Sequence, residues 1–155
     1  MAHLYLVRHA KAGERRLWNG DDIGRPLSKK GWRQSELIGK RLAKTKPSTL
    51  LSSPYVRCVQ TLEPLGALVD RAVSVDARLC EDEPFEPVLD LLRELPGGAV
   101  LCTHGDIIPS TVQALVKHGM KLNTPPDWRK SAVWVLKRNK KGDIVHATVW
   151  PPPVV

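Results

Sequence analysis

Short apolar segments typical of β-strands alternate along this chain with segments whose apolar residues recur at helical spacing. The expected strands are 4–7, 49–53, 72–75 and 99–103, and the helical stripes lie in 28–46, 54–69, 87–95 and 108–115. Two further strand-like segments, 132–136 and 144–149, flank a turn at 139–142 and predict a hairpin. This order predicts an α/β fold: a three-layer α/β/α sandwich with a mostly parallel central sheet and a C-terminal antiparallel hairpin.

Two helical segments and one loop carry specific expectations. The buried face of the first helix is expected to contain Leu37, Ile38 and Leu42. Pro64 lies inside the second helical stripe, so that helix is expected to kink or restart there. Residues 11–25 show no clear period and predict a long loop, and loops of this length often carry function.

Length, charge and cysteine content narrow the class of protein. A chain of 155 residues predicts one domain, 1–155, whose hydrophobic core is large enough to be stable without disulfide bonds or metal ions. The net charge of +8 favours anionic ligands, but the cations are spread along the sequence, which disfavours nucleic acid. No apolar run approaches the ~18 residues of a membrane span, so we expect no signal peptide and no membrane partner. Cys58, Cys80 and Cys102 lie far apart, which predicts reduced thiols and a cytoplasmic location.

Two of the expected strands end in a histidine. Arg8 and His9 follow the first strand directly, and His104 follows the strand at 99–103. Side chains at the carboxyl ends of strands stand where α/β proteins bind their ligands. A neutral imidazole is a nucleophile, and an arginine offers a flat fork of donors that suits phosphate. The pattern therefore predicts phosphoryl transfer to His9, with Arg8 and Arg57 as candidates to hold the phosphate oxygens.

Four segments in order along the chain resemble the motifs of the histidine phosphatase superfamily, which has the phosphoglycerate mutase-like fold. Residues 8–12 resemble the R-H-A-x-A signature of its short, SixA-like branch, and residues 22–31 resemble D-x-x-R-P-L-[ST]-x-x-G. Residues 52–61 resemble S-S-P-x-x-R-x-x-Q-T, and residues 102–105 match the block around the second histidine. The resemblance implies the three-layer fold expected above and a phosphatase activity.

Three further segments resemble one subgroup more closely. Residues 56–65, 101–109 and 130–136 look like the phosphatase domain that is fused to a Nudix domain in actinobacterial MutT-type hydrolases. The Nudix pattern itself, G-x5-E-x7-R-E-x-x-E-E, is absent from this chain. If the likeness extends to the substrate, it implies a nucleotide or another small phosphorylated metabolite.

The resemblance to the superfamily also implies a role for each matching residue. His9 would be the nucleophile and would form a phosphohistidine intermediate. Arg8, Arg57 and His104 would line the phosphate pocket. The general acid of the family is usually a glutamate in an L-x-E context, which Glu81 matches.

Three other residues are candidates for the same site. Glu83 lies two residues from Glu81 and is the second candidate for the acid, and a third option is that no carboxylate here acts as one. Arg25 either reaches the pocket or is tied to a neighbouring aspartate at the entry of the first helix. Trp18, in the loop after the first strand, is a candidate for contact with substrate.

We therefore expect a metal-independent phosphatase that needs no cofactor and hydrolyses phosphate monoesters of a small molecule, with nucleotides among the candidates. His3, His118 and His146 show no metal-ligand spacing. One alternative is a protein phosphohistidine phosphatase of the SixA type, whose partner would be a phosphorylated protein. An alternative of another class is a phospholigand-binding module without turnover. The sequence leaves the physiological substrate and the oligomeric state open.

Overall fold

A single seven-stranded sheet forms the centre of the molecule. The computed structural model describes residues 1–155. The strands are β1 (Ala2–Arg8), β2 (Thr49–Ser52), β3 (Val73–Val75), β4 (Ala99–Thr103), β5 (Lys121–Leu122), β6 (Val133–Arg138) and β7 (Ile144–Trp150). They lie in the order β3-β2-β4-β1-β6-β7-β5. The first four strands pair in parallel, whereas β6 runs antiparallel to both β1 and β7. The mostly parallel sheet and the hairpin are confirmed, and the two-residue strand β5, parallel to β7, was not predicted.

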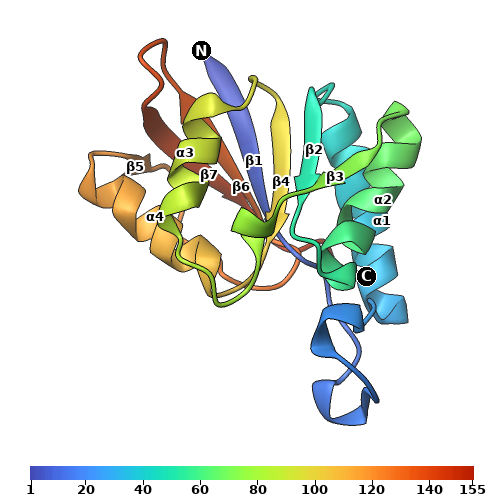
Figure 1. The fold of residues 1–155 in the computed structure, drawn as a ribbon. Coiled ribbons are helices and arrows are strands. Elements are labelled where there is room, and N and C mark those ends of the chain that lie inside the picture. The colour runs from blue at the N-terminus through green and yellow to red at the C-terminus, as the bar shows by residue number, and fades with distance from the viewer.

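Helices cover both faces of this sheet (Figure 1). Helices α1 (Lys29–Ala43) and α2 (Val56–Val69) lie on one face, and α3 (Glu86–Glu94) and α4 (Ile107–Lys117) lie on the other. Alternate residues of β1 supply the two cores, because successive side chains of a strand point to opposite faces. Tyr5 and Val7 pack in the cluster with α1 and α2, while Leu4 and Leu6 pack in the cluster with α3 and α4. The three-layer sandwich is therefore confirmed.

The expected restart of the second helix at Pro64 and one expected buried residue of the first helix differ from the structure. Helix α2 neither ends nor restarts at Pro64 but continues from Val56 to Val69. Tight packing against α1 explains this, because a Cβ on Gly39 would lie only 3.0 Å from the Leu65 nitrogen. The helix is held along its length, so the loss of one backbone hydrogen bond at proline does not break it. Leu37 is 39% exposed and lies outside the buried face of α1, which Ile38 and Leu42 do occupy.

The segment between β1 and α1 projects beyond the carboxyl ends of the strands (Figure 1). It contains two short 3₁₀ turns, Arg15–Leu17 and Asp22–Gly24, and a β-bridge between Ala12 and Leu27 ties its two ends together. The prediction of a loop is thus confirmed in outline, with local turns that sequence periodicity could not reveal. None of the helices has the length and apolarity needed to cross a membrane.

Candidate active site

The parallel pairing of β1 with β4 brings the two strand-end histidines together. Arg8 is aligned with Thr103 in the sheet, so His9 and His104 follow side by side at the carboxyl ends of β1 and β4. The His9 backbone N–H donates to the Thr103 carbonyl at 3.1 Å. The two imidazole rings lie edge to face with centroids 5.5 Å apart, and both are almost completely buried.

The surroundings of His9 hold its imidazole in one neutral form. Its Nδ1 lies 2.8 Å from the Ala10 carbonyl oxygen, which can only accept, so Nδ1 carries the proton. Nε2 is then left with its lone pair. Burial lowers the pKa of His9 from 6.5 to about 3, opposed by the Ala10 carbonyl and helped by the charges of His104, Arg57 and Arg8. Near neutral pH the residue is therefore an uncharged imidazole that can act as a nucleophile.

This lowered pKa makes the stability of the protein depend on pH. Between pH 6.5 and about 3 the unfolded chain binds a proton on His9 that the folded protein does not bind. The free energy of unfolding should therefore fall, from this residue alone, by about 1.4 kcal/mol for each pH unit below 6.5. Replacing His9 with Gln removes the group. In urea titrations between about pH 4 and pH 6, the variant should gain stability relative to wild type by that slope. Identical pH dependence in both proteins would contradict the burial of a neutral His9.

Unpartnered polar atoms gather around the two histidines. Only four buried side-chain nitrogen or oxygen atoms in the chain have no hydrogen-bond partner, and three of them are Arg8 Nε, Arg57 Nε and His104 Nδ1. The fourth, Ser48 Oγ, lies just before β2, at the amino end of that strand and so away from the two histidines. A buried donor without an acceptor costs about 1–3 kcal/mol, so three in one place call for a ligand. The three nitrogens suit an anion with several oxygens.

His104 is oriented by the residues that follow β2. Its Nε2 lies 2.9 Å from Ser53 Oγ and 3.6 Å from Cys58 Sγ. The Ser53 hydroxyl accepts the Tyr55 backbone N–H at 3.2 Å and can donate its own proton to His104 Nε2. In that arrangement His104 Nδ1 carries the ring proton and is a free donor. Tyr55 also packs edge to face against the His104 ring at 4.6 Å between centroids.

Arg57 is fixed by two carboxylates. The residue lies in the first turn of α2 and its side chain is only 1% exposed. Nη1 donates to the Asp22 carbonyl oxygen at 3.0 Å, and Nη2 donates to Asp22 Oδ2 at 3.2 Å and to Glu81 Oε2 at 3.0 Å. These bonds hold the guanidinium plane and leave Nε as its free donor. Asp22 is in turn held by Arg25 and Arg15. Burial alone would raise the pKa of Asp22, but the hydrogen bond from Arg25 and the charges of Arg57, Arg25 and Arg15 lower it.

Arg8 depends on a glycine and a distant turn. A Cβ at Gly105 would lie 2.6 Å from Arg8 Cζ, so the guanidinium can occupy its place only because residue 105 has no side chain. Arg8 Nη1 donates to the Trp128 carbonyl at 2.6 Å. The Ser131 backbone N–H donates to the carbonyls of both Arg8 (3.1 Å) and His9 (3.2 Å), and Ser131 has the left-handed φ of 67°. The turn before β6 therefore braces the end of β1.

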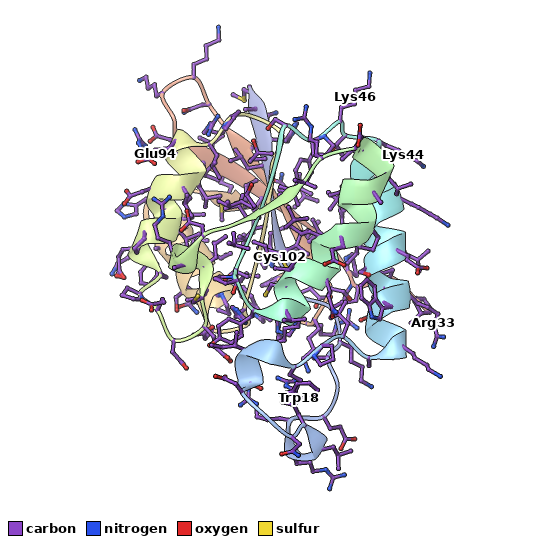
Figure 2. All side chains as sticks on the ribbon, turned by 45° about the vertical axis from the view of Figure 1, so that its right-hand side comes forward. Trp18, Arg33, Lys44, Lys46, Glu94 and Cys102 are labelled. Atoms are coloured by element: carbon purple, nitrogen blue, oxygen red, sulfur yellow. The ribbon has the colours of Figure 1, made fainter.

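The remaining candidates lie at different places. Glu81 contacts Arg57 and, at 3.7 Å, Arg15, with its side chain 26% exposed. Glu83 is exposed and takes part in no salt bridge. Arg25 is buried, donating to Asp22 Oδ1 at 2.8 Å and to the Gly13 carbonyl at 2.6 Å. Trp18 lies in the projecting segment (Figure 2), and its Nε1 donates to the Asp21 carbonyl at 2.8 Å.

The structure therefore brings Arg8, His9, Arg57, His104 and Glu81 together, while Arg25 is joined to them only through Asp22. Several supporting residues were given no role from the sequence. Thr61 Oγ accepts the Ala10 N–H at 3.0 Å and donates to the Arg57 carbonyl at 2.7 Å, so it joins the two motifs. Asp22 and Ser53 lie within the motifs at 22–31 and 52–61, and this position was the sequence signal that could have pointed to them. Ser131 lies in the segment 130–136, whose resemblance to a subgroup of the family gave the residue no role, and it contacts the site across more than a hundred residues.

Sequence comparisons relate this chain to known proteins. Residues 4–83, just over half of the chain, match the profile of the Histidine phosphatase superfamily (branch 1). An 8-oxo-(d)GTP phosphatase of Mycolicibacterium smegmatis is 32% identical over 154 residues, covering 96% of this chain. The chain spans about half of that relative, 48% of its length.

Solved structures show the same fold. The protein histidine phosphatase SixA, complexed with tungstate, superposes with a TM-score of 0.75 at 23% identity, covering 96% of this chain and 94% of that one. A mycobacterial glucosyl-3-phosphoglycerate phosphatase superposes with a TM-score of 0.70 at 17% identity, covering 98% and 99%. The family profile covers the motifs at residues 8–61, whose order along the chain predicted this family. This chain belongs to branch 1 of the histidine phosphatase superfamily.

Proposed function

We propose that this chain is a phosphatase that hydrolyses phosphate monoesters of a small molecule in two steps through a phosphohistidine on His9. The observation that carries the proposal is the set of three buried, unpartnered nitrogens on Arg8, Arg57 and His104 beside a neutral His9. A phosphoryl group supplies three oxygens for such donors and an electrophilic phosphorus for the imidazole. A binding module without turnover would not need a nucleophile held neutral at this position.

In the first step, His9 Nε2 attacks phosphorus in line with the leaving oxygen. The N–P bond forms, the P–O bond to the leaving group breaks, and a proton passes to the leaving oxygen. The Nδ1–H bond to the Ala10 carbonyl keeps the ring aimed and stabilises the positive charge that develops on it. Arg8, Arg57 and His104 donate to the equatorial oxygens, whose placement by fixed donors is the main source of rate enhancement in such reactions.

In the second step, water attacks the phosphohistidine. The O–P bond forms, the N–P bond breaks with its electron pair returning to Nε2, and water loses a proton to a nearby base. The side chain that gives a proton to the leaving oxygen in the first step can accept this proton from water in the second. Inorganic phosphate leaves and His9 returns to its neutral form.

Glu81 is our candidate for this acid and base, and Glu83 provides a matched control. For an ester with a poor leaving group, such as an alkyl phosphate, Glu81→Gln should lower kcat by roughly 10²-fold or more. For a nitrophenyl ester, which leaves without a proton, the loss should be much smaller. Glu83→Gln should change neither, because that side chain is exposed and unpaired. Steady-state kinetics of both variants on both esters test whether Glu81 is the general acid.

The same experiment separates two roles for Glu81. This carboxylate also holds Arg57 Nη2 at 3.0 Å, so its loss could act through the arginine alone. In that case both esters would slow by the same factor. Equal losses on the two esters would therefore contradict the assignment of Glu81 as the acid.

We propose that phosphoryl transfer here needs no metal ion, because side-chain cations and a histidine face the phosphate. Turnover of a nitrophenyl phosphate should be unchanged after dialysis against EDTA and with EDTA in the assay. Loss of activity in EDTA that returns with a divalent metal would contradict the metal-free mechanism. No turnover of any phosphate ester by the untreated protein would contradict the phosphatase itself.

Two observations bear on the substrate class. The curated relative is named for a nucleotide substrate, which supports a small phosphorylated molecule such as a nucleotide. The similarity to the SixA fold favours a phosphohistidine protein as the second candidate. Parallel assays with nucleotides, sugar phosphates and a phosphohistidine peptide would rank them by kcat/KM. We further propose that the protein works in the reducing cytoplasm, which the three free cysteines support.

A further inference from the structure

A strongly basic groove lies next to the candidate active site. It has a volume of about 610 Å³ and contains five cationic residues, Arg8, Lys11, Lys30, Arg129 and Lys130. Its other lining residues are Gln34 and the segment 152–155, so no Asp or Glu side chain lines it. Arg129 is paired with Asp127 at 2.6 Å, but the other four cations take part in no salt bridge. Four cations without a salt bridge in one groove repel each other, and a bound anion would reduce that repulsion.

Arg8 connects this groove to the phosphate pocket. Its unpartnered Nε belongs to the set of donors around His9, and the same side chain lines the groove. Lys11 follows His9 by two residues and Lys130 precedes Ser131, which donates to the Arg8 and His9 carbonyls. An anion bound in the groove would therefore share Arg8 with a phosphoryl group bound at His9.

The backbone around Lys11 and Lys130 is held rigidly. The Lys11 N–H donates to Gln34 Oε1 at 3.0 Å, and its carbonyl accepts from the Ser28 N–H at 2.9 Å. A Cβ at Gly31 would overlap the Lys11 carbonyl oxygen, so the first turn of α1 packs directly on this backbone. At Lys130, the left-handed φ of Ser131 and the Trp128 ring stacked on Trp134 at 4.9 Å fix the turn.

The charge environment of Lys130 agrees with this placement. Although the Lys130 side chain is exposed, partial desolvation by the surrounding protein lowers its pKa, and the charges of Arg8, Arg25, Lys11 and Arg57 lower it further. The ammonium group therefore lies within the field of the arginines of both the groove and the phosphate pocket. A second anionic group on the ligand would relieve that repulsion.

We propose that this groove binds a second phosphate group of the substrate, one bridging oxygen away from the phosphoryl group that His9 takes. The inference rests on the proposed function and narrows its substrate class to small molecules that end in a diphosphate. The volume of the groove lies in the range of small-ligand sites, which favours such a molecule over the surface of a protein.

Equilibrium binding tests the groove without requiring turnover. At constant ionic strength, inorganic pyrophosphate should bind about tenfold or more tightly than inorganic phosphate, as expected for added charge-assisted hydrogen bonds. Calorimetry should show that this ratio falls toward one in the double variant Lys11→Gln/Lys130→Gln. Both lysines are exposed, so the variant should fold. Lys44→Gln, which removes a charge at the far end of α1 from the projecting segment (Figure 2), should leave the ratio unchanged.

Kinetics with a nucleotide pair give the second arm. The wild-type protein should favour ADP over AMP in kcat/KM by about tenfold or more, and the double variant should lose most of this preference. Equal losses for pyrophosphate and phosphate, or for ADP and AMP, would overturn the proposal and leave the lysines as a general positive field. A protein that binds pyrophosphate selectively but hydrolyses no ester would refute the proposed function and not the groove.

Discussion

Replacing His9 with alanine should reduce kcat by roughly 10⁴-fold or more, because the residue is the proposed nucleophile of the first step and carries the phosphoryl group that water attacks in the second. The two arginines and His104 would remain, so phosphate should still bind with an affinity close to that of the wild-type protein. Steady-state assays on a nitrophenyl ester and calorimetry with inorganic phosphate measure the two effects. His118→Ala is the matched control, since that histidine is exposed at the end of α4.

Labelling of the enzyme assigns the effect of His9 to covalent chemistry. Wild-type protein quenched in base during turnover should carry phosphate that is stable to base and labile to acid, on the peptide containing His9. The His9→Ala variant should carry none. Full activity in His9→Ala, or label on another residue, would contradict the assignment of the nucleophile.

Replacing Arg57 with lysine should lower kcat/KM by roughly 10²–10³-fold, the usual cost of removing one fixed donor from a transition-state site. Lysine keeps the positive charge but has no planar fork. It could satisfy Asp22 or Glu81, and it cannot also present a donor where Arg57 Nε lies. The substitution therefore tests the geometry of the donor and not its charge.

The control for this variant is a lysine at another arginine that is paired with an aspartate. Arg78 binds Asp76 at 2.7 Å on the surface, in the 3₁₀ turn after β3, and Arg78→Lys should leave the kinetics unchanged. Thermal unfolding of both variants shows whether either substitution disturbs the fold. Wild-type kinetics in a folded Arg57→Lys protein would contradict the role of this residue.

The fold followed from the sequence where the signal was local and regular. Alternating apolar strands and amphipathic helices predicted the sandwich, and the pairing of β1 with β4 then placed His9 beside His104 as expected. The expectation failed where tertiary packing decided the outcome. Pro64 stays within α2 because α1 packs against it at Gly39, and no residue pattern near Pro64 reveals that contact. The strand β5 has only two residues, too short for any period to appear.

The sequence named residues that converge at the candidate site, but it did not name the residues that position them. The motifs named Arg8, His9, Arg57 and His104, and all four converge. The partners that aim them come from other parts of the chain. The Ser131 N–H braces β1 from the turn before β6, and the Lys11 backbone rests on the first turn of α1. Such contacts are made by backbone atoms over long sequence separations, so the identity of the residue carries little information about them.

The stereochemistry at phosphorus tests the central claim most directly. The measurement uses a thiophosphate ester made chiral at phosphorus with an oxygen isotope and hydrolysed in water of another isotope. Each in-line displacement inverts phosphorus, so transfer to His9 followed by transfer to water predicts overall retention of configuration. Inversion would mean that water attacks the substrate in a single step, and it would contradict the covalent mechanism.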